Sequence, residues 1–541
     1  MNSRLLGDSA TKPACAGPIS SQPEPTQVGF VAAGPKGANS FARRFDADTA
    51  ARRAIAAVDL GAESGRVMLA RFDGQRLTLE EVHRFPNIPV VAREHRFWNL
   101  PGLWEETLLG LRLTRQQAGA LDSIGVDTWG VDYGLLDANG QTARLPYCYR
   151  DHRTDGVMEQ VLARVPQADL YGRTGIQFMP FNTLFQLYAH ERQQPGELGA
   201  ARRLLLMPDL IHHKLNGGLI SEETNATTTQ CWDPIGRRWA TDLLERLEIP
   251  TTMLPAVAAP GTVLGRVQPA LRGDVGNALV IAPATHDTGS AIAATPASDE
   301  PGWAYISSGT WSLVGAEVSQ PIITPEARVA NWTNEGGVFG TTRFLKNVMG
   351  LWLLQECQRS WARDGQARDY GTLLAEADSV PAFAALIDPD DARFLAPDDM
   401  PTTINDYLRE HGQAPLTTPG QFARCIMESL TLRYTEVLRR LGALIGQPIT
   451  RVHVLGGGSR NARLNQWLAD ATGLPVLAGP VEATALGNAL MQLVGLGEAS
   501  SLAEIRAIAR RAAEPQVFEP RAAARAAWDD AAGRFVALSA R

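Results

Sequence analysis

The sequence predicts an α/β fold divided into two large, similar domains. Its 541 residues exceed what a single hydrophobic core usually holds. Strand-like and helix-like patterns follow one another in mixed order, which is typical of α/β proteins. A strand–turn–strand pattern that begins at Ala54 recurs at Trp303, with small polar residues at both turns. Two such units could each offer a turn to one shared ligand.

The N-terminal segment, residues 1–53, is predicted to be a disordered extension. It is rich in Pro, Gly, Ala, Ser and Thr and shows no sustained hydrophobic period. The pattern changes abruptly at Ala54, where the first domain is expected to begin. Turn-forming residues concentrate between Pro296 and Gly302. We therefore expect the two domains over residues 54–298 and 299–541.

The first domain opens with two predicted strands joined by a tight turn. AIAAVDL is a short apolar run that ends at Gly61, and RVMLARF alternates apolar and polar residues after Gly65. Longer apolar runs predict one buried strand in each of the segments 122–136 and 278–287. Helical spacing predicts helices over residues 182–192 and 204–215.

The second domain repeats this opening, with strands predicted on either side of Ser308-Gly309-Thr310. Amphipathic patterns then predict helices over residues 345–361 and 422–445, and VHVLGG predicts a strand over residues 452–457. Arginines alternate with alanines from residue 505 to 525, which predicts a solvated terminal helix.

Composition restricts the possible partners to small molecules. The net charge of −7 gives no basic field for a nucleic acid or an anionic membrane. No segment approaches the roughly 18 consecutive apolar residues that a membrane span needs. The five cysteines form no CxxC pair, so reduced thiols in a cytoplasmic protein are expected. Either a monomer or a small homo-oligomer is compatible with the sequence.

The turn from Asp59 to Arg66 is a candidate phosphate site. Gly61 and Gly65 would let the backbone turn tightly and leave amide N–H groups and the Ser64 hydroxyl free to face an anion. Asp59 ends the first strand and could orient a hydrated Mg²⁺ ion, which needs few protein carboxylates. Taken alone, such a hairpin is more often only a hairpin.

The second turn, Ser307 to Thr310, offers hydroxyl and amide groups without a bulky side chain. Two facing turns could clamp the β- and γ-phosphates of a nucleotide. The chain has no Gly-Lys-Ser/Thr, HRD or DFG motif, so phosphate transfer would use neither a P-loop nor a protein-kinase fold. The triplet Gly456 to Gly458 could let an adenine ring lie against its backbone, although such triplets are more often only turns into a helix.

Asp287 is a candidate general base. It follows the predicted buried strand ALVIAP and stands where a helix is expected to begin. Phosphoryl transfer to an alcohol needs a group that accepts the hydroxyl proton, and a carboxylate can do this. An isolated Asp at this position is more often a helix N-cap, so the residue alone does not decide between the two roles.

These four segments, in this order, resemble the FGGY family of carbohydrate kinases. The resemblance implies two actin-like, ribonuclease H-like ATPase domains with the active site in the cleft between them. Five further stretches resemble the members that act on L-rhamnulose: GVDTWGVDYGLLD, YRDHRTDG, GIQFMPFNTLFQL, TNATTTQ and LKNVMGLWLLQ. The resemblance extends from about Ala54 to Leu493.

The resemblance also implies residue roles, with ATP as co-substrate, Mg²⁺ as cofactor and Asp287 as the catalytic base. Asp59 would contact the metal ion through water. Glu63 places an acidic side chain in a phosphate turn, so we expect that side chain to point away from the nucleotide. The residues implied to surround the sugar are Gly130, His286, Asp287, Thr288 and Asn347. Those implied to hold ATP are Ala62, Glu63, Ser64, Gly65, Arg66, Thr310, Gln355 and Gly457.

The implied reaction is transfer of the γ-phosphate of ATP to the 1-hydroxyl of L-rhamnulose. One alternative keeps this chemistry and changes the acceptor to L-fuculose, D-xylulose or glycerol, because sequence does not place the pocket side chains. Another alternative is an inert actin-like scaffold or sugar sensor. The presence of Asp59, Asp287 and both phosphate turns argues against it, since an inert binder needs no general base.

Overall fold

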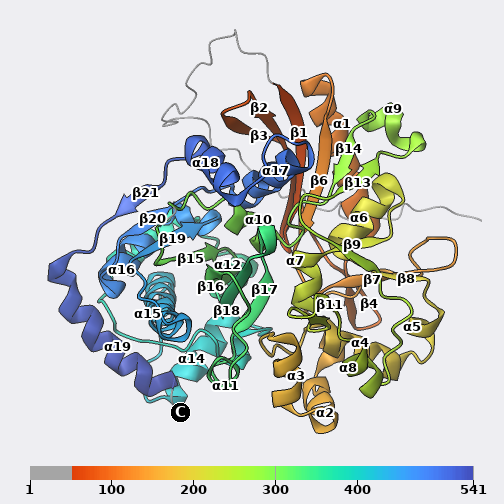
Figure 1. Cartoon of the computed structure of the whole chain (residues 1–541). Helices are drawn as coiled ribbons and strands as arrows, with labels where there is room; N and C mark the ends of the chain where they lie inside the picture. Colours follow the sequence, from red (N-terminus) through yellow and green to blue (C-terminus); the bar gives the residue numbers. More distant parts are fainter. Residues whose placement is uncertain (1–51, 299, 540–541) are drawn as a thin grey trace, which may run out of the picture. The chain divides into compact units, whose positions relative to one another are not determined.

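Two β-sheets organise the part of the chain that the computed structural model describes, residues 52–298 and 300–539 (Figure 1). All described residues belong to one unit, Ala50–Arg541. The predicted disorder of residues 1–53 therefore falls almost wholly outside the described residues. The mixture of sheets and helices confirms the α/β prediction.

The first sheet has six strands in the order β13-β14-β6-β1-β2-β3. The strand β1 pairs antiparallel with β2 and parallel with β6, and β6 pairs parallel with β14. Successive β1 side chains point to opposite faces: Val58 packs in a cluster with α1, whereas Ala57 packs in a cluster with α17. The strand bounds are β1 Arg53–Leu60, β2 Ser64–Phe72, β3 Leu77–Pro86, β6 Ser123–Thr128, β13 Val263–Arg266 and β14 Leu279–Ile281. The covering helices are α1 Leu100–Ala118, α6 Met207–Asn216 and α17 Ala483–Gly495.

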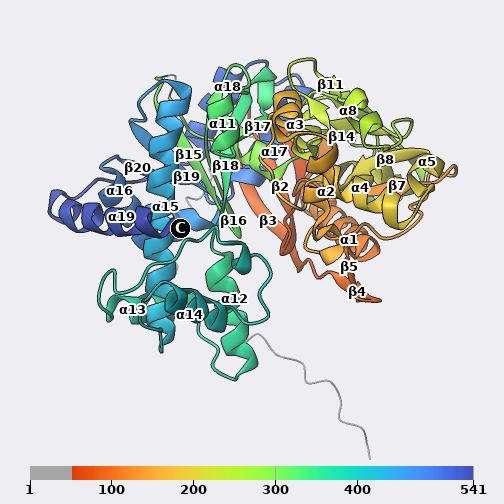
Figure 2. The same ribbon diagram turned by 90° about the horizontal axis from the view of Figure 1, so that it is seen from below.

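The second sheet has seven strands in the order β17-β18-β16-β15-β19-β20-β21. Its centre repeats the plan of the first sheet, because β15 pairs antiparallel with β16 and parallel with β19. The long helix α15 packs against β16 and β18, as Figures 1 and 2 show. The strand bounds are β15 Trp303–Ser308, β16 Trp311–Val318, β17 Thr333–Gly336, β18 Thr342–Met349, β19 Arg451–Leu455, β20 Val476–Ala478 and β21 Gln516–Phe518. The helices beside it include α12 Trp352–Arg363, α15 Pro419–Ile445 and α16 Ala462–Thr472.

The helix α17 follows β20 of the second sheet in sequence but packs on the first sheet (Figure 1). It crosses α10, Asp287–Ala293, so closely that a Cβ atom at Gly487 would overlap the carbonyl oxygen of Ser290. Asn488 donates hydrogen bonds to the carbonyl oxygens of Val58 and Gly125, at 3.4 and 3.3 Å. Helix α17, from the C-terminal half of the chain, therefore covers one face of the first sheet. The domain bounds expected from sequence stay a prediction.

The remaining elements form smaller sheets and covering helices. The further strands are β4 Val90–Ala92, β5 His95–Phe97, β7 Tyr133–Leu136, β8 Arg203–Leu206, β9 Ile220–Glu222, β10 Trp232–Asp233, β11 Arg238–Trp239 and β12 Ala256–Ala258. The further α-helices are α2 Val157–Arg164, α3 Gln167–Thr174, α4 Thr183–Gln193, α5 Glu197–Ala200, α7 Glu223–Ala226, α8 Thr241–Arg246, α9 Arg272–Val275, α11 Pro325–Val329, α13 Tyr370–Asp378, α14 Met400–Glu410, α18 Leu502–Ala512 and α19 Arg525–Ser539.

Three sequence-based element predictions were wrong in part. Residues 204–206 form the end of β8, and α6 begins only at Met207, where Pro208 occupies a first-turn position. Residues 345–349 belong to β18, and Gly350 separates this strand from α12. Residues 122–136 form two strands, β6 and β7, in place of one. Short apolar runs fit both a buried strand and a buried helix, so their tertiary partners decided between the two.

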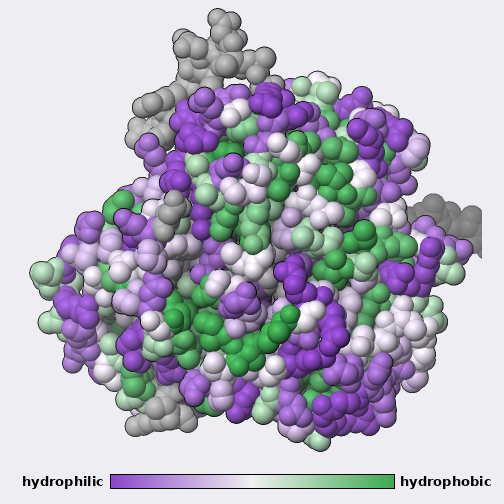
Figure 3. Space-filling view, in the orientation of Figure 1, coloured by the Kyte–Doolittle hydropathy of each residue, from purple (hydrophilic) through white to green (hydrophobic). Residues whose placement is uncertain are grey.

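The arginine-rich C-terminal region was also expected to be a solvated helix, and this is wrong for α18. Arg506 is only 8% exposed and forms an ion pair with Glu317 of β16. The apolar side of α18, which includes Ile505 and Ile508, packs in the same cluster as α17. Figure 3 shows hydrophilic and apolar side chains intermixed on the face seen in Figure 1.

Four cysteines, Cys148, Cys231, Cys357 and Cys425, are buried and form no disulfide. Cys15 lies outside the described residues. None of the helices in the described part of the chain combines the length and the apolar character needed to cross a lipid bilayer.

Candidate active site

A cavity of about 340 Å³ lies between the strand ends of the two sheets, and both sheets contribute to its walls. From the first sheet come Asp59 at the end of β1 and Gly130 after β6. Parallel strands carry their carboxyl ends to the same edge of a sheet, which explains why these segments meet. From the second sheet come the turn between β15 and β16 and the glycine segment after β19. The four segments singled out in the sequence therefore line one cavity.

The first turn joins β1 to β2 and is closed by a hydrogen bond of 2.9 Å from the Gly61 amide to the Ser64 carbonyl oxygen. Most of its predicted ATP residues line the cavity: Ala62, Glu63, Ser64 and Arg66. Gly65 does not line it. A Cβ atom at Gly65 would overlap the ring of Phe85, so this glycine is needed for packing between β2 and β3.

The charged side chains of this turn already have partners. The Asp59 carboxylate accepts hydrogen bonds of 2.8 and 2.6 Å from Arg66. Arg66 also pairs with Glu482 next to α17, so it joins the first turn to the second half of the chain. The Glu63 carboxylate pairs with Arg359 of α12. The amide groups of the turn and its serine hydroxyl are therefore the groups that can face an anion.

The second turn, Ser307 to Thr310, lines the cavity on the opposite side together with Gly456 and Gly457. Gly456 has φ 77° and ψ −163°, a conformation that only glycine adopts readily. A Cβ atom at Gly458 would overlap the Ser308 side chain, whereas one at Gly457 would meet no atom within 4 Å. Gly456 and Gly457 thus present backbone without side chains to the cavity. Gln355, predicted to contact ATP, lies on α12 and does not line the cavity.

Asp287 is the first residue of α10, and His286 occupies the N-cap position. The Oδ1 atom of Asp287 accepts hydrogen bonds from the Thr288 amide at 2.6 Å and from the Thr288 hydroxyl at 3.2 Å. Its Oδ2 atom accepts no hydrogen bond from any described residue, and 30% of the side chain is exposed to the cavity. Burial raises the pKa of Asp287, and the nearby Asp59 carboxylate adds to this rise. One carboxylate oxygen is fixed and the other is free to accept a proton.

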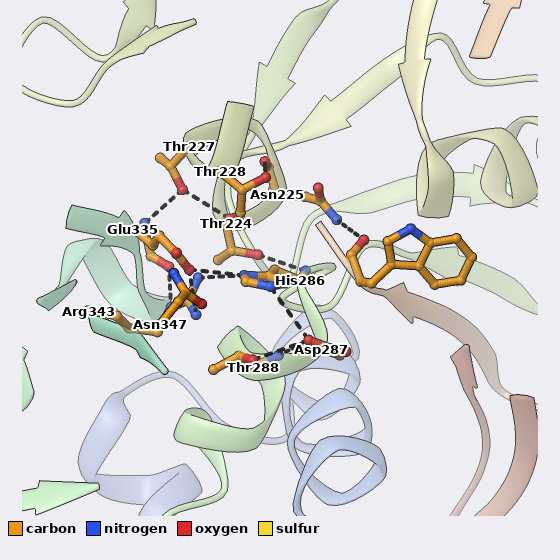
Figure 4. A network of polar contacts seen from close by, with 12 residues as sticks. Thr224, Asn225, Thr227, Thr228, His286, Asp287, Thr288, Glu335, Arg343 and Asn347 are labelled. Atoms are coloured by element: carbon orange, nitrogen blue, oxygen red, sulfur yellow. Dashed lines mark hydrogen bonds and ion pairs between the residues drawn. The ribbon is translucent and has the colours of Figure 1, made fainter. Parts of the chain in front are cut away.

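His286 lies in a polar network that the sequence did not reveal (Figure 4). Its Nδ1 atom lies 3.1 Å from Nη2 of Arg343 and 3.2 Å from Oε2 of Glu335. Both residues are buried, on β18 and β17 respectively. Charged residues inside buried strands could have been a signal, but the last part of β18 was predicted as helix, and the strand was missed.

The predicted sugar residues Gly130, His286, Asp287, Thr288 and Asn347 all line the cavity. The Asn347 amide donates a 2.9 Å hydrogen bond to Oε1 of Gln177, which joins β18 to the segment before α4. A Cβ atom at Gly130 would lie 2.9 Å from Oγ1 of Thr228, so this glycine allows close approach of the threonine. Sequence reasoning gave no individual role to several further lining residues, which include Arg84, Tyr149, Gln177, Phe181, Asn182, Thr228, Trp311, Glu335 and Thr484.

Two family models match the chain: the N-terminal domain of the FGGY family of carbohydrate kinases over residues 54–293, and its C-terminal domain over residues 304–496. The chain belongs to the FGGY family of carbohydrate kinases. The predicted resemblance is therefore confirmed, and this chain has the two-domain FGGY kinase fold.

Curated relatives of this FGGY kinase are similar over nearly their whole length. A rhamnulokinase from Pectobacterium atrosepticum is 48% identical over 492 residues, which cover 90% of this chain and 96% of the relative. A rhamnulokinase from Bacteroides thetaiotaomicron is 44% identical over 477 residues, which cover 88% and 97%.

Solved structures of sugar kinases share the fold at low identity. A xylulose kinase from Lactobacillus acidophilus gives a TM-score of 0.74 at 15% identity, and the match covers 90% of this chain and 97% of the other. Plasmodium falciparum glycerol kinase with ADP gives a TM-score of 0.70 at 14% identity, with coverage of 90% and 97%. At such identities the likeness supports the fold and leaves the acceptor open.

Proposed function

We propose that this carbohydrate kinase transfers the γ-phosphate of ATP to the 1-hydroxyl of L-rhamnulose, giving L-rhamnulose 1-phosphate and ADP. The observation that carries the proposal is the identity of 44% to 48% with rhamnulokinases over about nine tenths of the chain. We place the reaction in the cytoplasm, where the buried free thiols would stay reduced.

The reaction would take place in the cavity between the two sheets. The sugar would lie against Gly130, His286 and Asn347, because these residues line the same cavity as Asp287. The polyphosphate would lie between the first and second turns, where amide and hydroxyl groups can bind anions. The bare backbone of Gly456 and Gly457 leaves room for the adenosine.

Asp287 would act as the general base. Its Oδ2 atom takes the proton of the 1-hydroxyl while that oxygen forms a bond to the γ-phosphorus of ATP. The bond from the γ-phosphorus to the bridging oxygen then breaks, and ADP leaves with the electron pair. Closure of the cavity would exclude water, which otherwise competes with the sugar for the phosphoryl group.

The residues present fit a Mg²⁺ ion. Asp59 places a carboxylate on the cavity wall, and its Oδ1 atom is left over after the two bonds from Arg66 to Oδ2. Asp59 would hold the ion through water, since Mg²⁺ keeps several of its waters in proteins. When bound, the ion would neutralise charge on the phosphate oxygens.

The proposal is tested by a coupled assay of ADP release with Mg-ATP and a panel of ketoses and polyols. We expect strong turnover on L-rhamnulose and a kcat/KM at least about 100-fold lower on L-fuculose, D-xylulose and glycerol, a ratio within reach of a pocket that hydrogen-bonds its substrate. A higher kcat/KM for one of the other acceptors would keep the kinase and replace its substrate. Absence of turnover on every acceptor, with ATP binding intact, would refute catalysis and favour the inert scaffold.

A further inference from the structure

A buried ion pair of the second sheet lies against the histidine beside the proposed base (Figure 4). Glu335 and Arg343 stand opposite each other in the register of β17 and β18, with Nη1 of Arg343 3.2 Å from Oε2 of Glu335. The Arg343 side chain has no exposed surface, and that of Glu335 is 6% exposed. A hydrogen bond of 2.8 Å from Arg343 Nε to the Gly336 carbonyl oxygen fixes the guanidinium. Burial of two charges at this point calls for an explanation beyond stability.

The geometry around Nδ1 of His286 decides which nitrogen of the ring carries the proton. The guanidinium of Arg343 is always protonated, and its Nη2 atom donates to Nδ1 at 3.1 Å. Glu335 Oε2 is 3.2 Å from the same nitrogen but accepts no well-directed hydrogen bond from the described residues. A ring nitrogen that accepts a hydrogen bond carries no proton. The proton of the neutral ring must then be on Nε2, which lies 3.5 Å from Oδ1 of Asp287.

We infer that Glu335 and Arg343 hold His286 as the neutral tautomer protonated at Nε2, with this N–H directed toward Asp287 and the cavity. Arg343 excludes a proton from Nδ1, and Glu335 compensates the buried charge of Arg343. An Nε2–H group supports the Oδ1 side of the carboxylate, which Thr288 already binds, and leaves Oδ2 for the acceptor hydroxyl. A charged imidazolium at the same place would instead lower the proton affinity of the base.

The arrangement links the two halves of the chain. Glu335 and Arg343 belong to the second sheet, whereas His286 and Asp287 follow β14 of the first. Thr227 reinforces the link, because its hydroxyl accepts a 2.8 Å hydrogen bond from the amide of Gly336. The tautomer of His286 is therefore set only when the sheets are in contact, and Glu335 and Arg343 act as positioning residues.

The tautomer is measured directly by long-range ¹H–¹⁵N correlation spectra of the full-length protein labelled with ¹⁵N-histidine. His286→Asn identifies the signals of His286 by their loss. We expect an unprotonated, pyridine-type Nδ1 and a protonated Nε2 in the ligand-free enzyme at neutral pH. A protonated Nδ1, in either the other neutral tautomer or an imidazolium, would overturn the inference. This measurement does not depend on the proposed acceptor sugar.

Variants then test whether the ion pair sets the tautomer. In Arg343→Met the carboxylate of Glu335 becomes the neighbour of Nδ1, so this nitrogen should become protonated. The kcat of the kinase should fall about 10- to 100-fold, by analogy with the loss of a group that orients a metal-ligating histidine, with KM for ATP changed less than about threefold. An unchanged Nε2–H tautomer in this variant would contradict the inference. The kinetic part rests on the proposed function, whereas the spectrum does not.

Two further variants separate positioning from folding. Arg424→Met breaks a different buried ion pair, the one with Glu428 of the same helix α15, and should leave both the tautomer and kcat unchanged. If Arg343→Met does not fold, the double variant Glu335→Gln/Arg343→Met removes both charges and should populate both tautomers of His286. A single Nε2–H tautomer in the double variant would show that other groups fix the ring.

Discussion

Replacement of Asp287 by asparagine tests the proposed base with the least change in shape. The carbonyl oxygen of the amide can take the place of Oδ1 and still accept the 2.6 Å hydrogen bond from the Thr288 amide. The group at Oδ2 becomes an NH₂ that cannot accept a proton. General-base catalysis contributes about 10²- to 10⁴-fold, which corresponds to about 3–5 kcal/mol of transition-state stabilisation. We expect kcat to fall by at least about 10²-fold, with KM for ATP within about threefold.

The same variant should be more stable than the wild type at neutral pH, although its kcat is lower. Burial raises the pKa of Asp287 in the folded protein, so the charged form is disfavoured by folding. The contribution of Asp287 to the free energy of unfolding is fully present below the ordinary Asp pKa of about 3.9 and is lost as the pH rises through the raised pKa of the folded protein. A neutral asparagine side chain at this position avoids the loss. We expect a higher unfolding temperature than the wild type at neutral pH, and a difference that shrinks below about pH 4.

The measurements are ADP release, thermal unfolding and the pH profile of kcat. The wild-type profile should fall on the acid side at a pH above the ordinary Asp range, because Asp287 must be ionised to act. Asp364→Asn, an exposed position at the end of α12, is the matched control and should change neither property. Near-normal turnover of Asp287→Asn would refute the assignment of the base, and a lower unfolding temperature at neutral pH would refute the electrostatic reasoning.

Three further predictions concern the glycine segment after β19, the helix α17 and the first turn. Gly458→Ala should raise KM for ATP at least about tenfold, because the new Cβ would overlap the Ser308 side chain and shift the second turn. A KM for ATP within about threefold of the wild type, measured by ADP release, would contradict this cause. Asn488→Leu should lower the free energy of unfolding, measured by urea denaturation, by about 2–4 kcal/mol. The leucine leaves the buried carboxylate of Asp127 without its 2.5 Å hydrogen bond from Asn488. A loss under about 1 kcal/mol would refute this reasoning. Glu63→Ala should change the free energy of unfolding by less than about 1 kcal/mol, because the ion pair between Glu63 and Arg359 of α12 is exposed. It should change kcat by less than about threefold, because only the backbone amide of residue 63 is needed. A larger loss of kcat would show that the Glu63 side chain takes part in the reaction.

Sequence reasoning located the two turns and the carboxylate that line the cavity because their sequence patterns are local. A turn between two strands needs small residues in consecutive positions, and a carboxylate at the end of a buried apolar strand is visible in a single segment. The same locality produced its errors. Gly65 looks like a turn residue but serves the packing of Phe85, and residues 345–349 look helical although β16 and β17 pair with them as a strand.

Residues that act through partners far away in the chain were not predictable in this way. Glu335 and Arg343 carry no local motif, and their effect on His286 arises only because two sheets meet. Gln177 was likewise visible only as part of a longer stretch, although its side chain holds the backbone of Asn347. Single-sequence patterns report periodicity and turn chemistry, and neither contains the distance between two sheets.

The sequence by itself determined the α/β class, the two strand–turn–strand units, the resemblance to FGGY kinases and, through that resemblance, the proposal of Asp287. Each of these depends on residues that are neighbours in the chain. Only the tertiary structure shows that α17 covers a face of the first sheet, that Gly65 and Gln355 do not line the cavity, and that a buried ion pair faces His286. The physical reason is that packing and the burial of charges depend on which surfaces meet in the folded chain. A local pattern in the sequence does not contain that information.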